Sequence, residues 1–176
     1  LFILPLIIVL SACSTTYTPE TDQSRDYNFS TAKTFNIVGD DQLKNPMISD
    51  INRSRIDSAL ITSLIKQGKT EVNINSADVL ISYFIVTKDK IKVTPSYSGR
   101  YGRYGVHGYG GVSGIDARDY VEGTLIIDVI DNESKKTIWR STLTKSLKGY
   151  SNTEERDLAI NNAVSSMMES FPSQAI

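Results

Sequence analysis

A run of apolar residues between Asp78 and Lys88 constrains the fold of this chain more than any other feature. It reads Val-Leu-Ile-Ser-Tyr-Phe-Ile-Val over residues 79–86. Apolar side chains occupy both odd and even positions, so both faces of a strand would carry them. The run therefore predicts a central strand that is covered on one face and partly on the other.

Two further segments predict a hairpin. In the segment 120–131, alternate positions are apolar and share one face of a strand. Residues 131–136 read Asp-Asn-Glu-Ser-Lys-Lys, which is typical of a turn because such side chains bond their own backbone. The segment 137–147 returns as a strand with Trp139 and Leu143 on one face. We expect Trp139 to be buried under a helix.

Helical periodicity is present in two places. Residues 50–67 repeat apolar side chains at helical spacing, and Gly68 stands where a left-handed residue would end the helix. The basic residues of this region, including Lys69, are expected on its solvated face. Near the C-terminus, Ser151 and Glu154 match a capping box that precedes a second amphipathic helix.

The order of these elements is strand, helix, strand, long loop, hairpin and helix, with the first strand near residues 34–38. It predicts an α+β fold: a small sheet of about four strands, mostly antiparallel or mixed, with two helices packed on one face. A chain of 176 residues suits one core, so residues 26–176 are expected to form a single domain.

Composition excludes several classes of function. The chain has 19 Lys and Arg against 20 Asp and Glu, a net charge of −1, and nucleic acid is not expected as a partner because that would need a basic excess. A single Cys cannot form an internal disulfide, and a single His cannot build a His-rich metal cage. We expect no metal and no cofactor.

The N-terminal segment predicts export and lipidation. Residues 1–10 are apolar and uncharged, too short to span a bilayer but long enough for the core of a signal peptide whose basic start is missing. Leu10-Ser11-Ala12-Cys13 resembles a bacterial lipobox, in which small residues admit the peptidase and the thiol receives the lipid. Residues 1–12 are therefore interpreted as a truncated signal peptide, and Cys13 as the acylated first residue of the mature chain.

Residues 13–25 are rich in Ser and Thr and lack an apolar period, so they predict a flexible tether between the lipid and the domain. Ser14 stands beside Cys13, where an Asp often signals retention in the inner membrane. By this resemblance the protein is expected to be anchored in the outer membrane of the bacterial envelope and to face the periplasm.

A Gly/Tyr-rich loop is predicted at residues 95–118, which hold seven of the eleven glycines and four of the nine tyrosines. Its glycines do not follow the phosphate-binding pattern, and RNA is an unsuitable partner for an exported protein. It could contact an envelope protein, a glycan or a lipid, since Tyr offers amphipathic contact area, or it could be a mobile extension of a hairpin. The candidate binding residues are Tyr97, Arg100, Tyr101, Arg103, Tyr104, His107 and Tyr109.

No catalytic constellation is evident in the sequence. His107 is the only candidate base, and it lies in the Gly/Tyr-rich loop, a poor place to hold catalytic geometry. Glu122 and Asp128 share a strand face, but six residues of strand separate them by roughly 20 Å. That separation exceeds the roughly 5–9.5 Å of two-carboxylate glycosidase sites. We therefore expect these acids to pair with Arg140 or Lys145.

Several short motifs, in their order and spacing, resemble the domain-of-unknown-function 4136 family of bacterial lipoproteins. The motifs are Cys13, Tyr27-x-Phe29, Thr34-Phe35, Lys66-Gln67-Gly68, Ala77 to Tyr83, Gly123 to Asp131, Thr137-Ile138-Trp139-Arg140 and Phe171-Pro172. This resemblance implies no established activity, and it transfers no catalytic residues.

The expected function is therefore that of a non-enzymatic envelope lipoprotein, a periplasm-facing binding or structural module. The alternative is a small envelope hydrolase that acts on glycan or lipid with unidentified acidic residues. Acids converging in a cleft would favour the hydrolase, whereas a site without them would favour the binding module.

Overall fold

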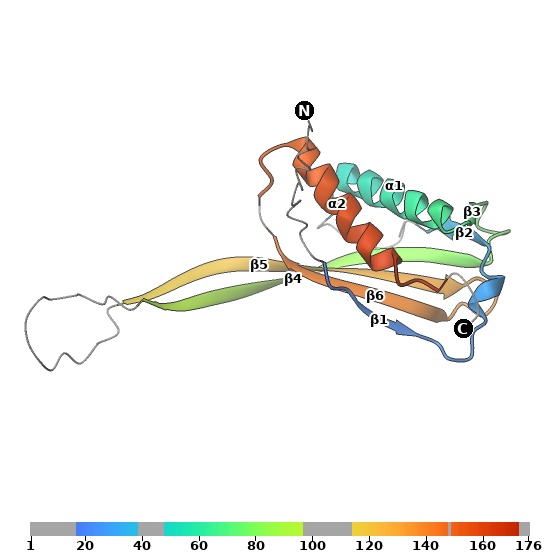
Figure 1. Ribbon diagram of the computed structural model, residues 1–176, viewed down its shortest axis with the longest axis horizontal. Helices are drawn as coiled ribbons and strands as arrows, with labels where there is room; N and C mark the ends of the chain where they lie inside the picture. Colours follow the sequence, from blue (N-terminus) through green and yellow to red (C-terminus); the bar gives the residue numbers. More distant parts are fainter. Residues whose placement is uncertain (1–16, 39–47, 97–113, 148, 173–176) are drawn as a thin grey trace, which may run out of the picture.

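The structure is a computed structural model that describes residues 17–38, 48–96, 114–147 and 149–172. Within these ranges, one six-stranded sheet carries two helices on one face (Figure 1). In chain order the elements are β1 (Glu20–Gln23), the 3-10 turn η1 (Phe29–Thr31), β2 (Thr34–Ile37), α1 (Asp50–Lys66), β3 (Thr70–Glu71), β4 (Val79–Ser96), β5 (Gly114–Asp131), β6 (Thr137–Ser146) and α2 (Thr153–Met168).

The strands lie in the order β1-β6-β5-β4-β2-β3. The long strands β4, β5 and β6 form an antiparallel centre in which Ile81, Val129 and Trp139 are neighbours across the sheet. β2 pairs with β4 in parallel, and such a pair needs a crossover connection, which α1 supplies. The expected α+β class is confirmed, but the sheet is mixed and has six strands rather than about four.

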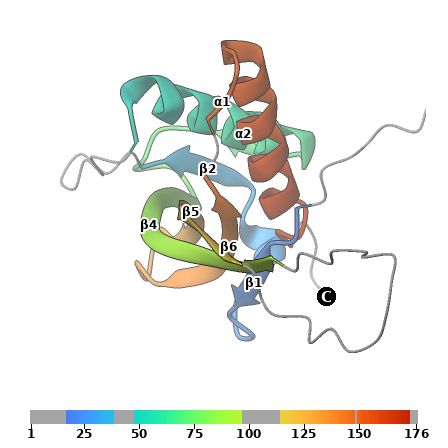
Figure 2. The same cartoon turned by 90° about the vertical axis from the view of Figure 1, so that its left-hand side faces the viewer.

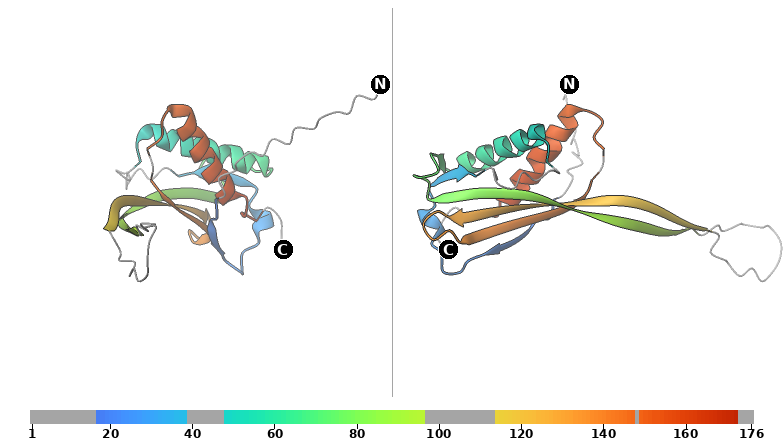
Figure 3. Two further views of the ribbon diagram at one scale, coloured as in Figure 1. Left: turned by 60° about the vertical axis from the view of Figure 1, so that its left-hand side comes forward. Right: turned by 180° about the vertical axis from the view of Figure 1, so that it is seen from behind.

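Both helices lie on the same side of the sheet, as the end-on and rear views show (Figures 2 and 3). Ser49 caps α1 by accepting a hydrogen bond from the backbone N–H of Asn52. Gly68, with φ +81°, follows the helix in the left-handed conformation that its sequence position predicts. The cap of α2 is Asn152, which accepts from the backbone N–H of Glu155. The cap therefore lies one residue after Ser151, the predicted cap.

The core fills the space between the helices and the sheet. Trp139 is 1% exposed, which confirms the expectation that it is buried. Its ring meets the ring of Phe171 edge-on, with 5.2 Å between centres, and Phe171 meets Phe29 in the same way at 6.0 Å. The aromatic cluster therefore joins the end of α2 to β6 and to η1.

β4 and β5 extend well beyond the rest of the sheet. β6 ends alongside Glu122, and eight further residue pairs, up to Ser96 and Gly114, continue as a two-stranded ribbon. At about 3.4 Å per residue the ribbon is roughly 27 Å long. Figure 1 shows it projecting away from the helices. The predicted loop at 95–118 is thus too wide, because its ends are strand.

The extended end of β4 and the strand β1 were both missed in the sequence, because neither has an apolar pattern. The charged run Lys88-Asp89-Lys90 does not end the strand as predicted, because β4 continues to pair with β5 through its backbone beyond the rest of the sheet and this pairing needs no apolar stripe. β1 is exposed throughout and pairs with β6 along its backbone, so the tether predicted for residues 13–25 includes a strand that no apolar period reveals.

Candidate functional site

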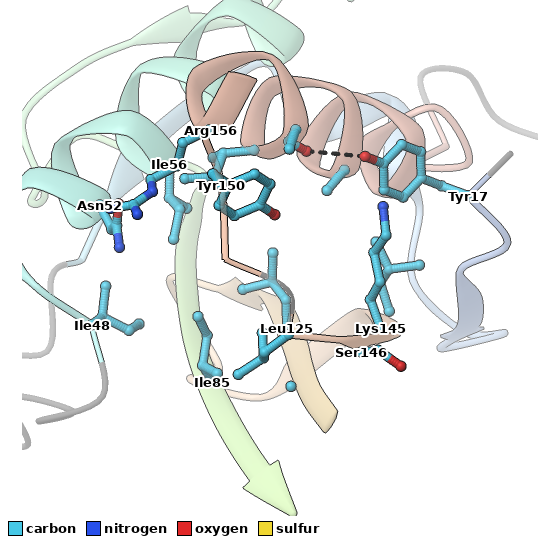
Figure 4. A pocket seen from close by; sticks show the side chains of 16 residues that line it. Tyr17, Ile48, Asn52, Ile56, Ile85, Leu125, Lys145, Ser146, Tyr150 and Arg156 are labelled. Carbon is cyan, nitrogen blue, oxygen red and sulfur yellow. Dashed lines mark hydrogen bonds between the residues drawn. The ribbon is translucent and has the colours of Figure 1, made fainter. Parts of the chain in front are cut away.

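A cavity of about 340 Å³ opens between the two helices and the end of the sheet from which the ribbon departs. This volume lies in the range of about 300–1,000 Å³ that is usual for small-molecule sites. Most of the sixteen lining residues are aliphatic, and Figure 4 shows Tyr17 and Lys145 on one side, Asn52 on the other and Tyr150 between them. The lining residues are Tyr17, Ile48, Asn52, Ile56, Ile85, Gly123, Leu125, Leu143, Lys145, Ser146, Leu147, Tyr150, Arg156, Ala159, Ile160 and Ala163.

Tyr17, the first described residue, forms one wall of the cavity. Its hydroxyl donates to the backbone oxygen of Ala159 at 3.3 Å, and its own backbone oxygen accepts from Ser166 Oγ at 3.4 Å. Both partners belong to α2, so the N-terminal arm is fixed along this helix. Residues of the predicted tether therefore contribute to the domain and to its cavity.

Lys145 stands beneath Tyr17 (Figure 4), with its Nζ 4.1 Å from the centre of the tyrosine ring. Alternation along β6 places Trp139, Leu143 and Lys145 on the helix-facing side of the sheet. The first two are buried, whereas Lys145 is exposed. The apolar stripe of β6 thus ends in a cation at the point where the cavity opens.

Gly123 permits a close approach on the sheet side of the cavity. A Cβ at this position would lie 2.7 Å from Cδ2 of Leu147, closer than nonbonded carbons come. The missing side chain therefore lets Leu147 fold over β5 and form part of the lining.

A second cation stands on the helix side. Arg156, in the first turn of α2, lies with its guanidinium 5.6 Å from the centre of the Tyr150 ring. Nearby, Arg55 of α1 pairs with Asp157 of α2 and donates to Asn52 at 2.9 Å. This link holds the two helices together at the cavity.

Carboxylates are absent from the lining set, and the acids considered in the sequence have other partners. Asp128 accepts two hydrogen bonds from Arg140, at 2.6 and 2.7 Å, as expected. Glu122 pairs with Lys90 at 3.2 Å, not with Arg140 or Lys145. Among the described residues, no group of three or more Asp, Glu, His or Cys side chains could hold a metal ion.

The residues predicted to carry function lie outside the described ranges. Cys13 precedes the first of them, and the candidate binding residues fall in 97–113, the segment that connects the two strands of the ribbon. The cavity was missed in the sequence. Its one visible signal is Lys145, a charge on the face that Trp139 and Leu143 mark as buried.

Polar groups elsewhere under the helices stabilise the fold. Tyr83 is 4% exposed and donates to Oδ1 of Asp57 at 2.6 Å, and burial raises the pKa of its hydroxyl well above the usual value. Burial also lowers the pKa of Lys69, which donates to the backbone oxygen of Ala32 at 2.6 Å. Lys69 is thus buried, contrary to its predicted place on a solvated face.

Asp78 anchors β2 to the start of β4. It accepts hydrogen bonds from the hydroxyl and the backbone N–H of Thr34, both at 2.8 Å, and from the backbone N–H of Lys33 at 3.0 Å. Burial alone would raise the pKa of this carboxyl, but the bonds from Thr34 and Lys33 outweigh it and hold the pKa below its usual value.

The fold and the cavity define a small α+β domain with a mixed sheet, a helix pair on one face and an apolar site between them. The chain belongs to the family described as Domain of unknown function (DUF4136), whose sequence model matches residues 19–173. This match confirms the resemblance found in the sequence. Comparison with curated protein sequences gives no match.

Three solved structures are similar to this chain at low sequence identity, and the first of them has a TM-score above 0.5. A PDZ domain protein from Parabacteroides distasonis is 17% identical with a TM-score of 0.56, covering 91% of this chain, which spans only 36% of that protein. A DUF4136 family protein from Bacteroides thetaiotaomicron is 18% identical with a TM-score of 0.48, covering 89% and 97% of the two chains. The PelC dodecamer from Paraburkholderia phytofirmans is 12% identical with a TM-score of 0.46, covering 92% and 99%.

The described part of the chain contains no helix that is both long and apolar enough to cross a membrane.

Proposed function

We propose that this protein is a non-enzymatic lipoprotein of the bacterial envelope whose domain binds a small apolar or amphipathic ligand in the cavity. Acyl chains on Cys13 anchor it in the outer membrane, and the domain faces the periplasm. The observation that carries the proposal is the lining of the cavity, which is aliphatic, is edged by Lys145 and Arg156, and contains no carboxylate.

The same lining argues against the alternative of a hydrolase. Two-carboxylate hydrolysis needs a pair of acids within roughly 5–9.5 Å across the bound substrate, and acyl transfer needs a nucleophile with an adjacent base. Ser146 is the only hydroxyl other than those of Tyr17 and Tyr150 in the lining set, and no His, Asp or Glu accompanies it there. Lys145 is the one amine in the lining, and the Ser146 hydroxyl points away from it (Figure 4), as alternation along β6 requires. Binding without chemistry is the activity that this set of side chains supports.

A neutral, apolar fluorophore such as Nile red tests the proposal on the purified full chain. We expect saturable binding with one site per chain. Ala163→Phe should abolish it, because the new ring would occupy part of the cavity that Ala163 lines. Asn162→Phe is the matched control, since Asn162 is the exposed neighbour on α2 and does not line the cavity. Equal binding by a folded Ala163→Phe variant would contradict the proposal.

The ribbon supports a second proposed role, which is contact with an envelope protein, a glycan or a lipid. It projects from the body (Figure 3), and in the sequence the Gly/Tyr-rich residues 97–113 connect its two strands. Replacing residues 98–113 by a short Gly-Ser turn should remove crosslinks made in intact envelopes while the domain stays folded. A folded deletion variant that keeps every crosslink would argue against this role.

A further inference from the structure

We infer that the ligand of the cavity is a single-chain anionic lipid, represented by a long-chain fatty acid, whose carboxylate pairs with Lys145 while its chain lies against the aliphatic wall. This inference rests on the proposed function of the cavity and adds the chemical class of the ligand. It is argued from the walls of the cavity, from its charge and from its position relative to the lipid anchor.

The walls suit one extended hydrocarbon chain. Every layer of the domain contributes aliphatic side chains: Ile56 from α1, Ile160 from α2, Ile85 from β4 and Leu125 from β5. The volume of about 340 Å³ lies near the lower end for small-molecule sites, which favours one chain over the two of a diacyl lipid. Each CH₂ group removed from water adds to the binding free energy, so a long chain would supply most of the affinity.

The charge of the lining selects an anion. Lys145 and Arg156 are its only charged residues, and neither has a carboxylate partner among the described side chains. Lys145 is the better placed of the two for a headgroup, because it is exposed where the sheet leaves the cover of the helices. The Tyr17 ring, 4.1 Å away, holds the ammonium at the opening (Figure 4).

The position of Tyr17 brings this opening close to the bilayer. Four residues of chain cover at most about 14 Å, so the Cα of Tyr17 lies within that distance of the Cα of Cys13. With Cys13 acylated, the Lys145 end of the cavity is therefore held near the lipid headgroups. A flexible tether of residues 13–25, as predicted, would have held the domain further from the bilayer. In the structure Tyr17 and β1 already pack on the domain, so only residues 13–16 are left to span this distance. A lipid that leaves the adjoining leaflet is thus the nearest source of a single-chain anion.

A pair of probes that differ only in charge tests the inference. cis-Parinaric acid is a fluorescent fatty acid, and its methyl ester has the same chain without the negative charge. Titrated into the full chain, the acid should bind about tenfold more tightly than the ester, as expected for one charge-assisted contact at an exposed site. Lys145→Gln should remove this preference, so that acid and ester bind with equal affinity to the variant. Lys66→Gln makes the same charge change on an exposed residue outside the cavity and should preserve the preference.

The outcomes separate this inference from the proposed function. Equal affinities of the parent for acid and ester, or an unchanged preference in Lys145→Gln, would overturn the inference while the cavity still binds apolar molecules. Failure of both probes and of Nile red to bind would overturn the proposed function as well. The Lys145→Gln side chain is exposed and makes no buried contact, so the variant is expected to fold.

Discussion

The ammonium of Lys145 lies 4.1 Å from the centre of the Tyr17 ring, although the two residues are far apart in the sequence. Tyr17 precedes β1, and Lys145 is close to the end of β6, the strand with which β1 pairs. Tyr17 thus forms part of the cavity wall, although it belongs to the predicted tether of residues 13–25. Under the proposed function, the ligand cavity and the lipid anchor are separated by only the few residues between Cys13 and Tyr17.

Replacing Cys13 with Ser tests the anchor. The signal-like segment and the lipobox predict that the thiol carries the lipid, and burial of acyl chains contributes about 0.8 kcal/mol per CH₂. The variant should be found in the soluble periplasmic fraction or should remain unprocessed, as fractionation and mass measurement would report. A mature Cys13→Ser protein that stays membrane-bound would contradict the lipoprotein assignment.

Trp139→Ala is expected to lower the free energy of unfolding by about 3–5 kcal/mol, since it leaves a large cavity among Phe171 and its neighbours. Urea denaturation followed by circular dichroism measures the change. Leu158→Ala provides the control, because Leu158 is 63% exposed on α2 and its loss should change stability by less than about 0.5 kcal/mol. Equal midpoints for Trp139→Ala and the parent would contradict the placement of this ring.

Ser141→Ala should leave stability unchanged or raise it by up to about 1 kcal/mol. Ser141 is fully buried between the helices and the sheet, and its Oγ has no hydrogen-bond partner among the described groups. Removing an unpaired hydroxyl relieves its desolvation and creates almost no void. A marked loss of stability in the same urea assay would show that the hydroxyl has a partner, such as a buried water.

Alkaline pH should destabilise the protein through Tyr83. Its pKa is raised in the folded state, mainly by burial, so above pH 10 the unfolded chain loses this proton while the folded chain keeps it. The contribution is complete below about pH 10 and is lost as the pH rises further, at no more than about 1.4 kcal/mol per pH unit. The free energy of unfolding, measured from pH 9 to 11.5, should fall more steeply for the parent than for Tyr83→Phe. Parallel curves would contradict this account.

The elements that pack through side chains were predictable from sequence. α1, α2, the hairpin of β5 and β6, and the burial of Trp139 follow from apolar periods that match the helix or the strand. The apolar run in β4 also marked the centre of the sheet correctly. In each case burial of one face requires apolar residues at a regular spacing, and this spacing can be read from the sequence.

The remaining elements form through the backbone or through distant partners. β1 and the ribbon pair by main-chain hydrogen bonds and leave no apolar period. Lys69 is buried because its ammonium donates a hydrogen bond to the backbone oxygen of Ala32 and lies 4.8 Å from the centre of the Phe171 ring, contacts that only the fold creates. The cavity likewise arises between five elements, α1, α2, β4, β5 and β6, and only Lys145 indicates it in the sequence.

The most direct test of the central claim is to identify what the cavity holds when the protein is purified from envelopes. Lipids extracted from the full chain, and from its Ala163→Phe and Asn162→Phe variants, would be compared by quantitative mass spectrometry. We predict that the parent and Asn162→Phe carry a single-chain anionic lipid at close to one molecule per chain, and that Ala163→Phe has lost it. The same lipids in equal amounts in all three proteins would contradict the claim that the cavity is the binding site.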